Sequence, residues 1–356
     1  MTQKVYLTLF GLAALIAASC HRPVARQPVR VTETRRHMGV PWTITAYAVD
    51  RQNAMGAIAS AHDEVARLER ILSDYDPASE LSRLSKQAPT SEPVRVGEDL
   101  WRVLSMAIAI RDASDGAFDP SVGPLTSLWR QARRTGVLPA PEKRAAAMAA
   151  VRPGALVLHP DLQAVSLLKP DMRLDLGGIG MGDAIDRAIA ILRGHGITAA
   201  MVDASGDIAV IGAPPGNRGW RIALAPMGPP GDPEEDLVIA DAAVTTSGDA
   251  FQAVTIDGVR YSHIVDPRTG LGVVGPAAVT VVAPDGTTAD AVATAASVLG
   301  PERGMKFIED TPGCAARFIW QTPDGLFHEA RSTGWRGEIL SPAPAPSPAS
   351  RNLGRF

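Results

Sequence analysis

Short β-type runs follow one another from residue 199 to residue 283, and they limit the possible folds more than any other feature of the sequence. Apolar runs of this length separated by turn signals are typical of a sheet built from sequence neighbours. Asp257-Gly258 divides two of the runs and indicates a tight β-hairpin, because glycine tolerates positive φ. The strands predicted here cover residues 201–202, 207–211, 220–225, 237–246, 251–256 and 279–282.

Helical patterns lie mainly in the first half of the chain. Ile58, Val65 and Leu68 share one face of a helix predicted over residues 53–72, after a strand over 42–49. Further helices are predicted over residues 99–114, 183–192 and 288–299, the last ended by Gly300-Pro301, and further strands over 172–176, 315–320 and 326–330. Because helices cluster early and strands late, we expect an α+β fold with a largely antiparallel sheet flanked by helices. With 356 residues, 46% of them hydrophobic, the chain can form one large domain or two packed lobes.

Residues 1–20 have the pattern of an export signal. Lys4 precedes an apolar run over residues 5–18 that ends in small residues and is too short to span a membrane comfortably. The ending Ile16-Ala17-Ala18-Ser19-Cys20 resembles a bacterial lipoprotein signal. We therefore expect export to the periplasmic side of a bacterial membrane, with a lipid anchor at Cys20. The alternative is an ordinary signal peptide in which the cysteine is incidental.

Residues without periodicity are expected to flank the folded part of the chain. Residues 21–35 are rich in Arg, Pro and Thr and suit a linker, whereas residues 336–356 have the composition of a disordered tail. We expect the domain itself to cover residues 36–335.

Composition excludes some classes of protein. Cys314 is the only cysteine beyond the export signal, so the domain has neither a disulfide framework nor a thiolate metal site. Any metal would need oxygen or imidazole ligands. The net charge is −3, and no cluster of Lys and Arg is interleaved with aromatic residues, which argues against a nucleic-acid partner.

A glycine-dense segment joins the strand predicted over residues 172–176 to the helix predicted over 183–192. Glycines at positions 177, 178, 180 and 182 would let backbone amides approach a phosphate at a helix N-terminus. The segment lacks the Gly-Lys-Ser/Thr ending of a P-loop, and Asp183 replaces the third glycine of the dinucleotide fingerprint. A tight strand-to-helix turn without a ligand explains the glycines equally well.

Two later segments carry candidate chemical groups. His263 lies at the end of a predicted strand beside the turn Asp266-Pro267-Arg268-Thr269-Gly270, where it could accept a proton near neutral pH. Asp290 and Thr294 are four residues apart, so on a helix their oxygens share a face and could bind one hard cation. The first segment could equally be a surface connector, and Asp290 could serve only the dipole of the first helical turn.

Three turn-rich segments of the first half each suit a surface on which a planar ring system could rest. They are Met38-Gly39, residues 73–82 around Tyr75, and residues 116–125, which contain Ala117-Phe118-Asp119-Pro120. Individually they are also what ordinary helix boundaries look like.

Taken in order, these six segments resemble the ApbE family, the FAD:protein FMN transferases, over about residues 35 to 335. The resemblance implies an ApbE-type, T-fold-like structure. It implies that the metal is held by the carbonyl of Gly178 and the side chains of Asp290 and Thr294, and that His263 assists deprotonation of an incoming threonine. The residues implied to line the FAD site are Met38, Tyr75, Ala117, Phe118, Asp119, Asp175, Met181 and Ile264.

The resemblance also implies an activity, namely Mg²⁺-dependent transfer of FMN from FAD to a threonine or serine of an acceptor flavoprotein, with release of AMP. The acceptor would belong to a membrane or exported electron-transfer system. Mg²⁺ suits this chemistry because it prefers oxygen ligands and binds substrate phosphates. Hydrolysis of FAD to FMN and AMP, and flavin binding without catalysis, remain the alternatives.

The sequence departs from the family pattern in the glycine loop. Met181 stands where the family usually has lysine, Asp183 stands where it usually has an aromatic residue, and residues 204–207 keep one glycine of a usual pair. A positive charge near the flavin is therefore missing. Because the implied metal positions are intact, we still expect activity.

Overall fold

The computed structural model describes residues 27–224, 235–248, 253–275, 277–322 and 324–340. The expected export signal with Cys20, and residues 341–356 of the expected tail, lie outside the described residues.

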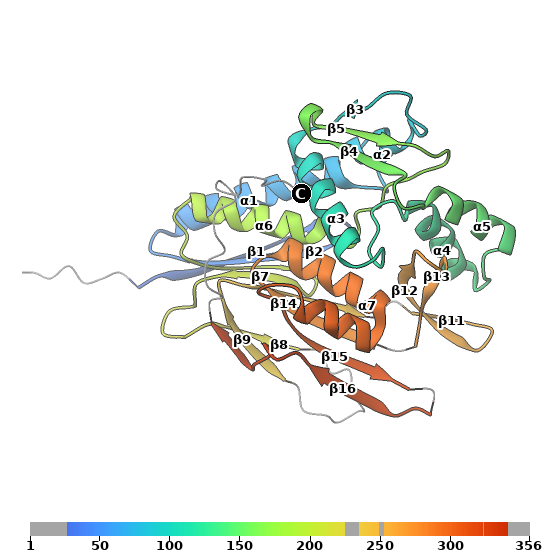
Figure 1. Cartoon of the computed structure of the whole chain (residues 1–356). Coiled ribbons are helices and arrows are strands. Elements are labelled where there is room, and N and C mark those ends of the chain that lie inside the picture. Colours follow the sequence, from blue (N-terminus) through green and yellow to red (C-terminus); the bar gives the residue numbers. More distant parts are fainter. Residues whose placement is uncertain (1–26, 225–234, 249–252, 276, 323, 341–356) are drawn as a thin grey trace, which may run out of the picture.

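An eight-stranded sheet forms the centre of the molecule (Figure 1), in the order β1-β2-β6-β7-β10-β14-β15-β16. Every neighbouring pair in it is antiparallel, which confirms the expected α+β fold. The strands are β1 (Val29–His37), β2 (Val40–Ala48), β6 (Ala199–Ala204), β7 (Asp207–Ile211), β10 (Ala243–Gly248), β14 (Ala277–Ala283), β15 (Ala315–Gln321) and β16 (Phe327–Arg331).

Three helices cover one face of this sheet: α1 (Arg51–Leu72), α6 (Gly180–Gly194) and α7 (Gly286–Glu309) (Figure 1). Their apolar stripes supply the main core; in α1, Ile58, Val65 and Leu68 are fully buried, as their spacing predicts. Above them lie α2 (Glu80–Ser85), α3 (Glu98–Ala113) and a small sheet of β3 (Val94–Arg95), β5 (Ala164–Leu167) and β4 (Leu156–His159), the last two joined through η1 (Pro160–Leu162). Among the described residues, no helix is long and apolar enough to cross a membrane.

A second small sheet covers the opposite face of the central sheet. It consists of β8 (Trp220–Ala223), β9 (Asp236–Ala240) and β17 (Glu338–Leu340). Trp220 and Leu237 from this sheet pack on Ile208 and Val244 of the central sheet in a separate apolar cluster. The middle strands of the central sheet are therefore covered on both faces.

A smaller lobe lies at one end of the layers and contains α4 (Gly123–Thr135), α5 (Pro141–Ala150), β11 (Val254–Ile256), β12 (Val259–Asp266) and β13 (Leu271–Val274) (Figure 1). Its core centres on Trp129, whose ring stands edge-on to Tyr261 with centroids 5.4 Å apart. The indole Nε1 of Trp129 donates to the carbonyl of Ser262 at 2.9 Å. These contacts fix β12 against α4.

Several expected boundaries differ in the structure. Residues 172–176 are not a ladder strand; they form one parallel bridge, between Arg173 and Val122. Residues 237–246 are two strands, β9 and β10. The expected linker 21–35 and tail 336–356 are both too long, because β1 begins at Val29 and β17 pairs in parallel with β9. By contrast, the helix expected to stop at Gly300-Pro301 does lose its helical geometry there: Gly300 has φ 78° and ψ 176°, and a second helical segment follows within α7.

The contact between α6 and α7 is unusually close because a glycine from each helix lies in it. A Cβ on Gly182 would lie 2.2 Å from the carbonyl oxygen of Gly286. Asp186, one turn further along α6, accepts hydrogen bonds from the amides of Gly286 and Thr287 at 2.6 and 2.8 Å. An α6 side chain therefore caps the N-terminus of α7, next to the helix's own cap, Asp285.

Replacing Gly182 with alanine should therefore destabilise the protein. The added methyl group meets backbone rather than a movable side chain, so we expect Gly182→Ala to lower the free energy of unfolding by about 1–3 kcal/mol or more. Chemical denaturation measures the change. Gly180→Ala is the matched control, because its Cβ would meet nothing closer than 3.7 Å and should cost less than about 1 kcal/mol. Equal effects of the two substitutions would contradict the close contact.

Candidate functional site

Asp175 is the best-connected carboxylate of the site. Its Oδ2 accepts from Thr126 Oγ1 at 2.7 Å and from Arg130 Nη2 at 2.8 Å, both on α4. Its Oδ1 accepts from the Gly177 amide at 2.8 Å, and its own amide donates to the Pro120 carbonyl at 2.9 Å. Asp175 is only 7% exposed. The guanidinium, hydroxyl and amide donors compensate its buried charge.

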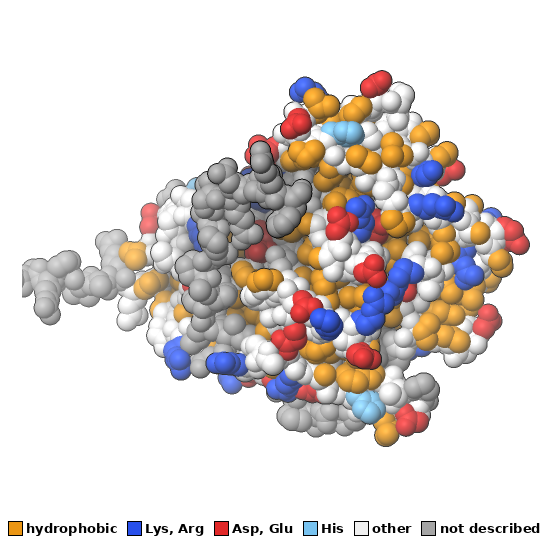
Figure 2. Space-filling model, in the orientation of Figure 1, with side chains coloured by type: hydrophobic (Ala, Val, Ile, Leu, Met, Phe, Trp, Pro, Cys, Tyr) orange, Lys and Arg blue, Asp and Glu red, His pale blue; other side chains and the backbone are white. Residues whose placement is uncertain are grey.

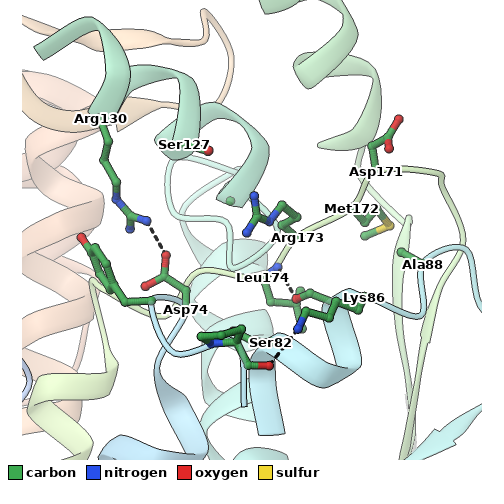
Figure 3. A pocket seen from close by; sticks show the side chains of 14 residues that line it. Asp74, Ser82, Lys86, Ala88, Ser127, Arg130, Asp171, Met172, Arg173 and Leu174 are labelled. Atoms are coloured by element: carbon green, nitrogen blue, oxygen red, sulfur yellow. Dashed lines mark hydrogen bonds and ion pairs between the residues drawn. The ribbon is translucent and has the colours of Figure 1, made fainter. Parts of the chain in front are cut away.

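Arg130 extends the cluster to the loop after α1. Its Nη1 donates to Asp74 Oδ2 at 2.5 Å, and its guanidinium lies 4.2 Å from the centroid of the Tyr75 ring. Burial and the nearby Asp175 carboxylate raise the pKa of Asp74 above its ordinary value, and Arg130 opposes this rise. Figure 3 shows Arg130 reaching from α4 towards Asp74. Tyr75 is 76% exposed, so its ring is held by the arginine and still open to a ligand.

A second cluster brings Gly178, Thr294 and Phe118 together. A Cβ on Gly178 would lie 2.9 Å from Thr294 Oγ1 and 3.2 Å from Phe118 Cε2, so only glycine fits here. Ala117, Phe118 and Asp119 are buried beside it, and Asp119 Oδ1 accepts from the amide and hydroxyl of Ser121 at 2.8 and 2.6 Å. Asp119 therefore orders its own turn.

Asp290 lies on α7 one turn before Thr294. Burial raises the pKa of Asp290 well above its ordinary value, and the nearby Asp207 carboxylate adds to the rise. The Gly182 amide donates to Asp290 Oδ2 at 3.1 Å, which leaves Oδ1 for another partner. A buried carboxylate beside a second carboxylate, with a hydroxyl and a backbone segment next to it, is a donor set that fits a hard divalent cation.

The donor set is mixed rather than purely acidic. Within the described ranges, no group of three or more His, Cys, Asp or Glu side chains is placed to hold a metal. A cation would therefore rely on Asp290 together with neutral oxygens, namely the Thr294 hydroxyl and the Gly178 carbonyl.

The remaining predicted residues sit on separate elements. His263 and Ile264 are half-buried on β12, and Ser262 Oγ accepts from the Ile264 amide at 3.1 Å. Arg268, in the following turn, donates to the Val298 carbonyl of α7 at 3.1 Å, which ties β12 to the helix that carries Thr294. Met38 occupies the turn between β1 and β2 with φ 48° and packs on the main core, but it joins neither cluster through a hydrogen bond.

The glycines of the glycine-dense segment have different neighbours. Gly182 serves the contact between α6 and α7, Gly178 makes room for Thr294, and Gly180 begins α6. Met181 is half-buried and packs on the main core. Asp183 accepts two hydrogen bonds from Arg102 on α3, at 2.9 and 2.8 Å, so its charge is neutralised within the fold.

Sequence reasoning missed Thr126 and Arg130. Their i, i+4 spacing places both on one face of α4, and this is the signal that could have suggested a shared partner. The partner itself, Asp175, lies 45 residues from Arg130 along the chain. On the surface, Figure 2 shows Lys and Arg side chains mixed with Asp and Glu over the face between α4 and α7.

The fold, an antiparallel sheet covered on one face by three helices, is similar to that of flavin transferases of known structure. The flavin transferase ApbE from Vibrio cholerae superposes with a TM-score of 0.76 at 32% identity, covering 86% of this chain and 98% of that one. The apo flavinyl transferase ApbE of Pseudomonas stutzeri gives 0.76 at 26% identity, covering 86% and 96%.

The chain belongs to the ApbE family, whose model matches residues 38–318. Curated relatives named FAD:protein FMN transferase include one from Vibrio cholerae, 32% identical over 338 residues, covering 91% of this chain and 97% of the relative. One from Treponema pallidum is 32% identical over 316 residues, covering 82% and 85%. The family resemblance drawn from the six segments is confirmed, and the chain is an enzyme of this family.

Removing Arg130 tests whether it compensates the two carboxylates. Arg130→Ala leaves Asp175 buried without a cation, so we expect the free energy of unfolding to fall by about 3 kcal/mol. Arg130→Lys should recover only part of the loss, because one ammonium cannot bridge both carboxylates as a guanidinium does. Arg134→Ala, an exposed position on the same helix, should change stability by less than about 0.5 kcal/mol. Urea denaturation at neutral pH distinguishes the variants; a stable Arg130→Ala protein would refute this role.

Proposed function

We propose that the protein transfers FMN from FAD to a threonine or serine hydroxyl of an acceptor protein, with Mg²⁺ as the metal and AMP as the leaving group. Family membership supports flavin transfer. The observation that carries the metal requirement is the contact of the Gly178 backbone with Thr294, one turn from the buried carboxylate of Asp290.

Asp290, Thr294 and the Gly178 carbonyl would hold the cation. When bound, Mg²⁺ supplies an electrophilic centre for the FAD pyrophosphate and offsets the charge that grows on the departing AMP. Asp290 offers one free oxygen, since its other oxygen is occupied by the Gly182 amide. That hydrogen bond orients the carboxylate before any cation binds.

Tyr75 supports the flavin end of the proposal. Its ring has Arg130 at 4.2 Å and is 76% exposed, so the planar isoalloxazine can lie against the tyrosine without displacing a packed side chain. Asp175 is bonded to Arg130, which lies against this ring. Phe118 lies next to Gly178 and therefore close to the proposed metal ligands. FAD can therefore extend from Tyr75 towards α7.

His263 is proposed to accept the proton of the attacking hydroxyl. Its strand is fixed by Trp129 of α4, and the turn after it is fixed by the bond from Arg268 to the Val298 carbonyl of α7, so the imidazole is carried on a rigid element. A neutral imidazole suits a proton acceptor at physiological pH. The hydroxyl oxygen would form the new bond to the FMN phosphorus as the bond to AMP breaks.

The pattern of residues 1–20 supports export and attachment to a membrane through a lipid on Cys20. We propose that the acceptor is then a flavoprotein of a membrane or exported electron-transfer system. This places donor, enzyme and acceptor on the periplasmic side.

Mass spectrometry tests the reaction directly. The protein is incubated with FAD, Mg²⁺ and candidate exported flavoproteins; we expect an acceptor to gain the mass of FMN less one water and AMP to appear in equal amount. Release of AMP and FMN without an adduct would instead establish FAD hydrolysis. FAD binding without either product would leave a flavin-binding protein and refute the proposal.

Asp290→Asn tests the metal requirement separately from the fold. It should slow FMN transfer by roughly a hundredfold or more and abolish the rise in melting temperature on adding Mg²⁺. Without Mg²⁺ the variant should be as stable as the unsubstituted protein or more stable, because a repelling buried charge is removed. Asp310→Asn, at the exposed end of α7, is the control and should keep the Mg²⁺ response. A normal Mg²⁺ response of Asp290→Asn would exclude Asp290 as a ligand.

A further inference from the structure

The two-residue turn between β1 and β2 holds a methionine in an unfavourable backbone conformation. His37 and Val40 pair across the turn, and Met38 and Gly39 between them have φ of 48° and 81°. Hairpin turns of this kind favour asparagine, aspartate or glycine at the first central position, because other side chains crowd the backbone when φ is positive. The turn alone does not explain a methionine here, and such a backbone outlier points to a function for its side chain.

Three hydrogen bonds hold this turn in place. His37 Nε2 lies 3.2 Å from Nδ1 of His62, which is fully buried on α1, and the centroids of the two rings are 5.2 Å apart. The indole Nε1 of Trp42 donates to the His37 carbonyl at 3.1 Å, and Arg36 Nη2 donates to the Gly39 carbonyl at 2.8 Å. The residue that opens the turn is therefore fixed through both its side chain and its carbonyl.

The bond between the two imidazoles depends on their protonation. One ring must accept the hydrogen bond, so its nitrogen must be unprotonated. Burial lowers the pKa of His62 to about 4 and also lowers the pKa of His37. Both rings are therefore neutral at neutral pH. A proton on His37 would place a charge in a partly desolvated position, and a proton on Nδ1 of His62 would remove the acceptor.

The charged groups that face the pair lie on β1 and α1. Glu33 and Arg35 come from β1, and Asp63 and Glu69 come from α1. Arg35 donates to Glu33 Oε1 at 2.8 Å and to Asp63 Oδ1 at 3.2 Å, so two of the carboxylates share its charge. The carboxylates partly oppose the effect of burial on the histidines, but burial remains the larger effect.

The lowered pKa values set the direction of the pH dependence. Each histidine binds its proton less readily in the closed turn than in an open one, where its pKa would be about 6.5. The contribution of the pair to holding the turn is therefore complete above about pH 6.5, and it is lost as the pH falls from there towards 4.

The histidine pair also connects the turn to the proposed flavin site. Met38 is one of the residues that the family resemblance places around FAD. The helix that carries His62 ends at Leu72, three residues before Tyr75. Figure 1 shows this helix, α1, lying along β1 and β2. The pair thus joins the turn to the element that leads into the Tyr75 loop.

We propose that the His37–His62 pair is a pH-sensitive hold on the β1–β2 turn: near neutral pH it presents Met38 to FAD, and in acid it releases the turn and weakens FAD binding. The inference rests on the proposed use of FAD and adds to it two positioning residues and a pH dependence.

Flavin fluorescence tests the proposal by measuring the FAD affinity of the full-length protein between about pH 7.5 and pH 5. The unsubstituted protein should lose affinity several-fold over this range. At neutral pH His37→Ala should weaken FAD binding about fivefold, because the bond to His62 is lost. His37→Gln should restore the neutral affinity and flatten the pH profile, since an amide can donate to His62 without titrating. Hydrogen exchange of residues 36–42 should become faster in His37→Ala and stay slow in His37→Gln.

Two comparisons separate the pair from other titrating groups. Burial raises the pKa of Asp186 and of Asp207 to about 7, so the measured quantity is the difference between the profiles of the unsubstituted protein and His37→Gln. His195→Gln, at an exposed histidine that ends α6, is the matched control and should reproduce the unsubstituted profile.

Equal pH profiles of the unsubstituted protein and His37→Gln, or unchanged FAD affinity in His37→Ala, would overturn the proposal. FMN transfer by a protein with these equal profiles would leave the proposed function standing without the hold on the turn. The expected profiles without an FMN adduct on any acceptor would refute FMN transfer and support the hold. No FAD binding at any pH would overturn both.

Discussion

The packing of α6 against α7 determines where the groups of the site can lie. Gly182 and Gly286 allow the two backbones to touch, and Asp186 bonds across to the first amides of α7. The same contact sets the rotation of α7, because the Gly182 amide donates to Asp290. Thr294, one turn later, then faces the loop before α6. A single helix pair therefore positions both side-chain oxygens proposed to bind the cation.

The buried carboxylates of the site are compensated in two different ways. Asp175 receives a guanidinium, a hydroxyl and an amide, so its interactions are complete without a ligand. Asp290 accepts a hydrogen bond from one amide. Its burial and the nearby Asp207 carboxylate make its charged form unfavourable in the absence of a cation. The bonds to Asp175 hold its loop against α4, whereas the uncompensated carboxylate of Asp290 favours binding of a cation. This difference supports the proposed position of the metal at α7, whereas Arg130 contacts the Tyr75 ring.

Local sequence signals predicted the positions of strands and turns better than they predicted which strands pair with each other. Asp257-Gly258 forms the expected hairpin with φ of 51° and 77°, because the requirement for positive φ lies within the two residues themselves. Met172, Leu174 and Leu176 alternate and are buried, as in the strand predicted over residues 172–176, yet that segment has only one bridge to a neighbour. Alternation reports which side chains are buried; whether a partner strand is present depends on residues far away in the chain. For the same reason β17 could not be predicted, since its partner β9 lies about a hundred residues earlier.

The motifs located Gly178, Asp290 and Thr294, but they did not show what connects the site to the rest of the fold. Ion pairs such as Arg130 with Asp175 and Arg102 with Asp183 join residues 45 and 81 positions apart, and nothing in either local segment identifies the partner. The pair with Arg102 also changes how the departure at Asp183 is understood. A carboxylate held by two hydrogen bonds is not an added negative charge facing FAD, because its charge is matched inside the protein. Asp183, which replaces the family's aromatic residue, is thus bound to Arg102 of α3, and the lysine missing at position 181 is the departure that the family resemblance leads us to expect to affect flavin binding.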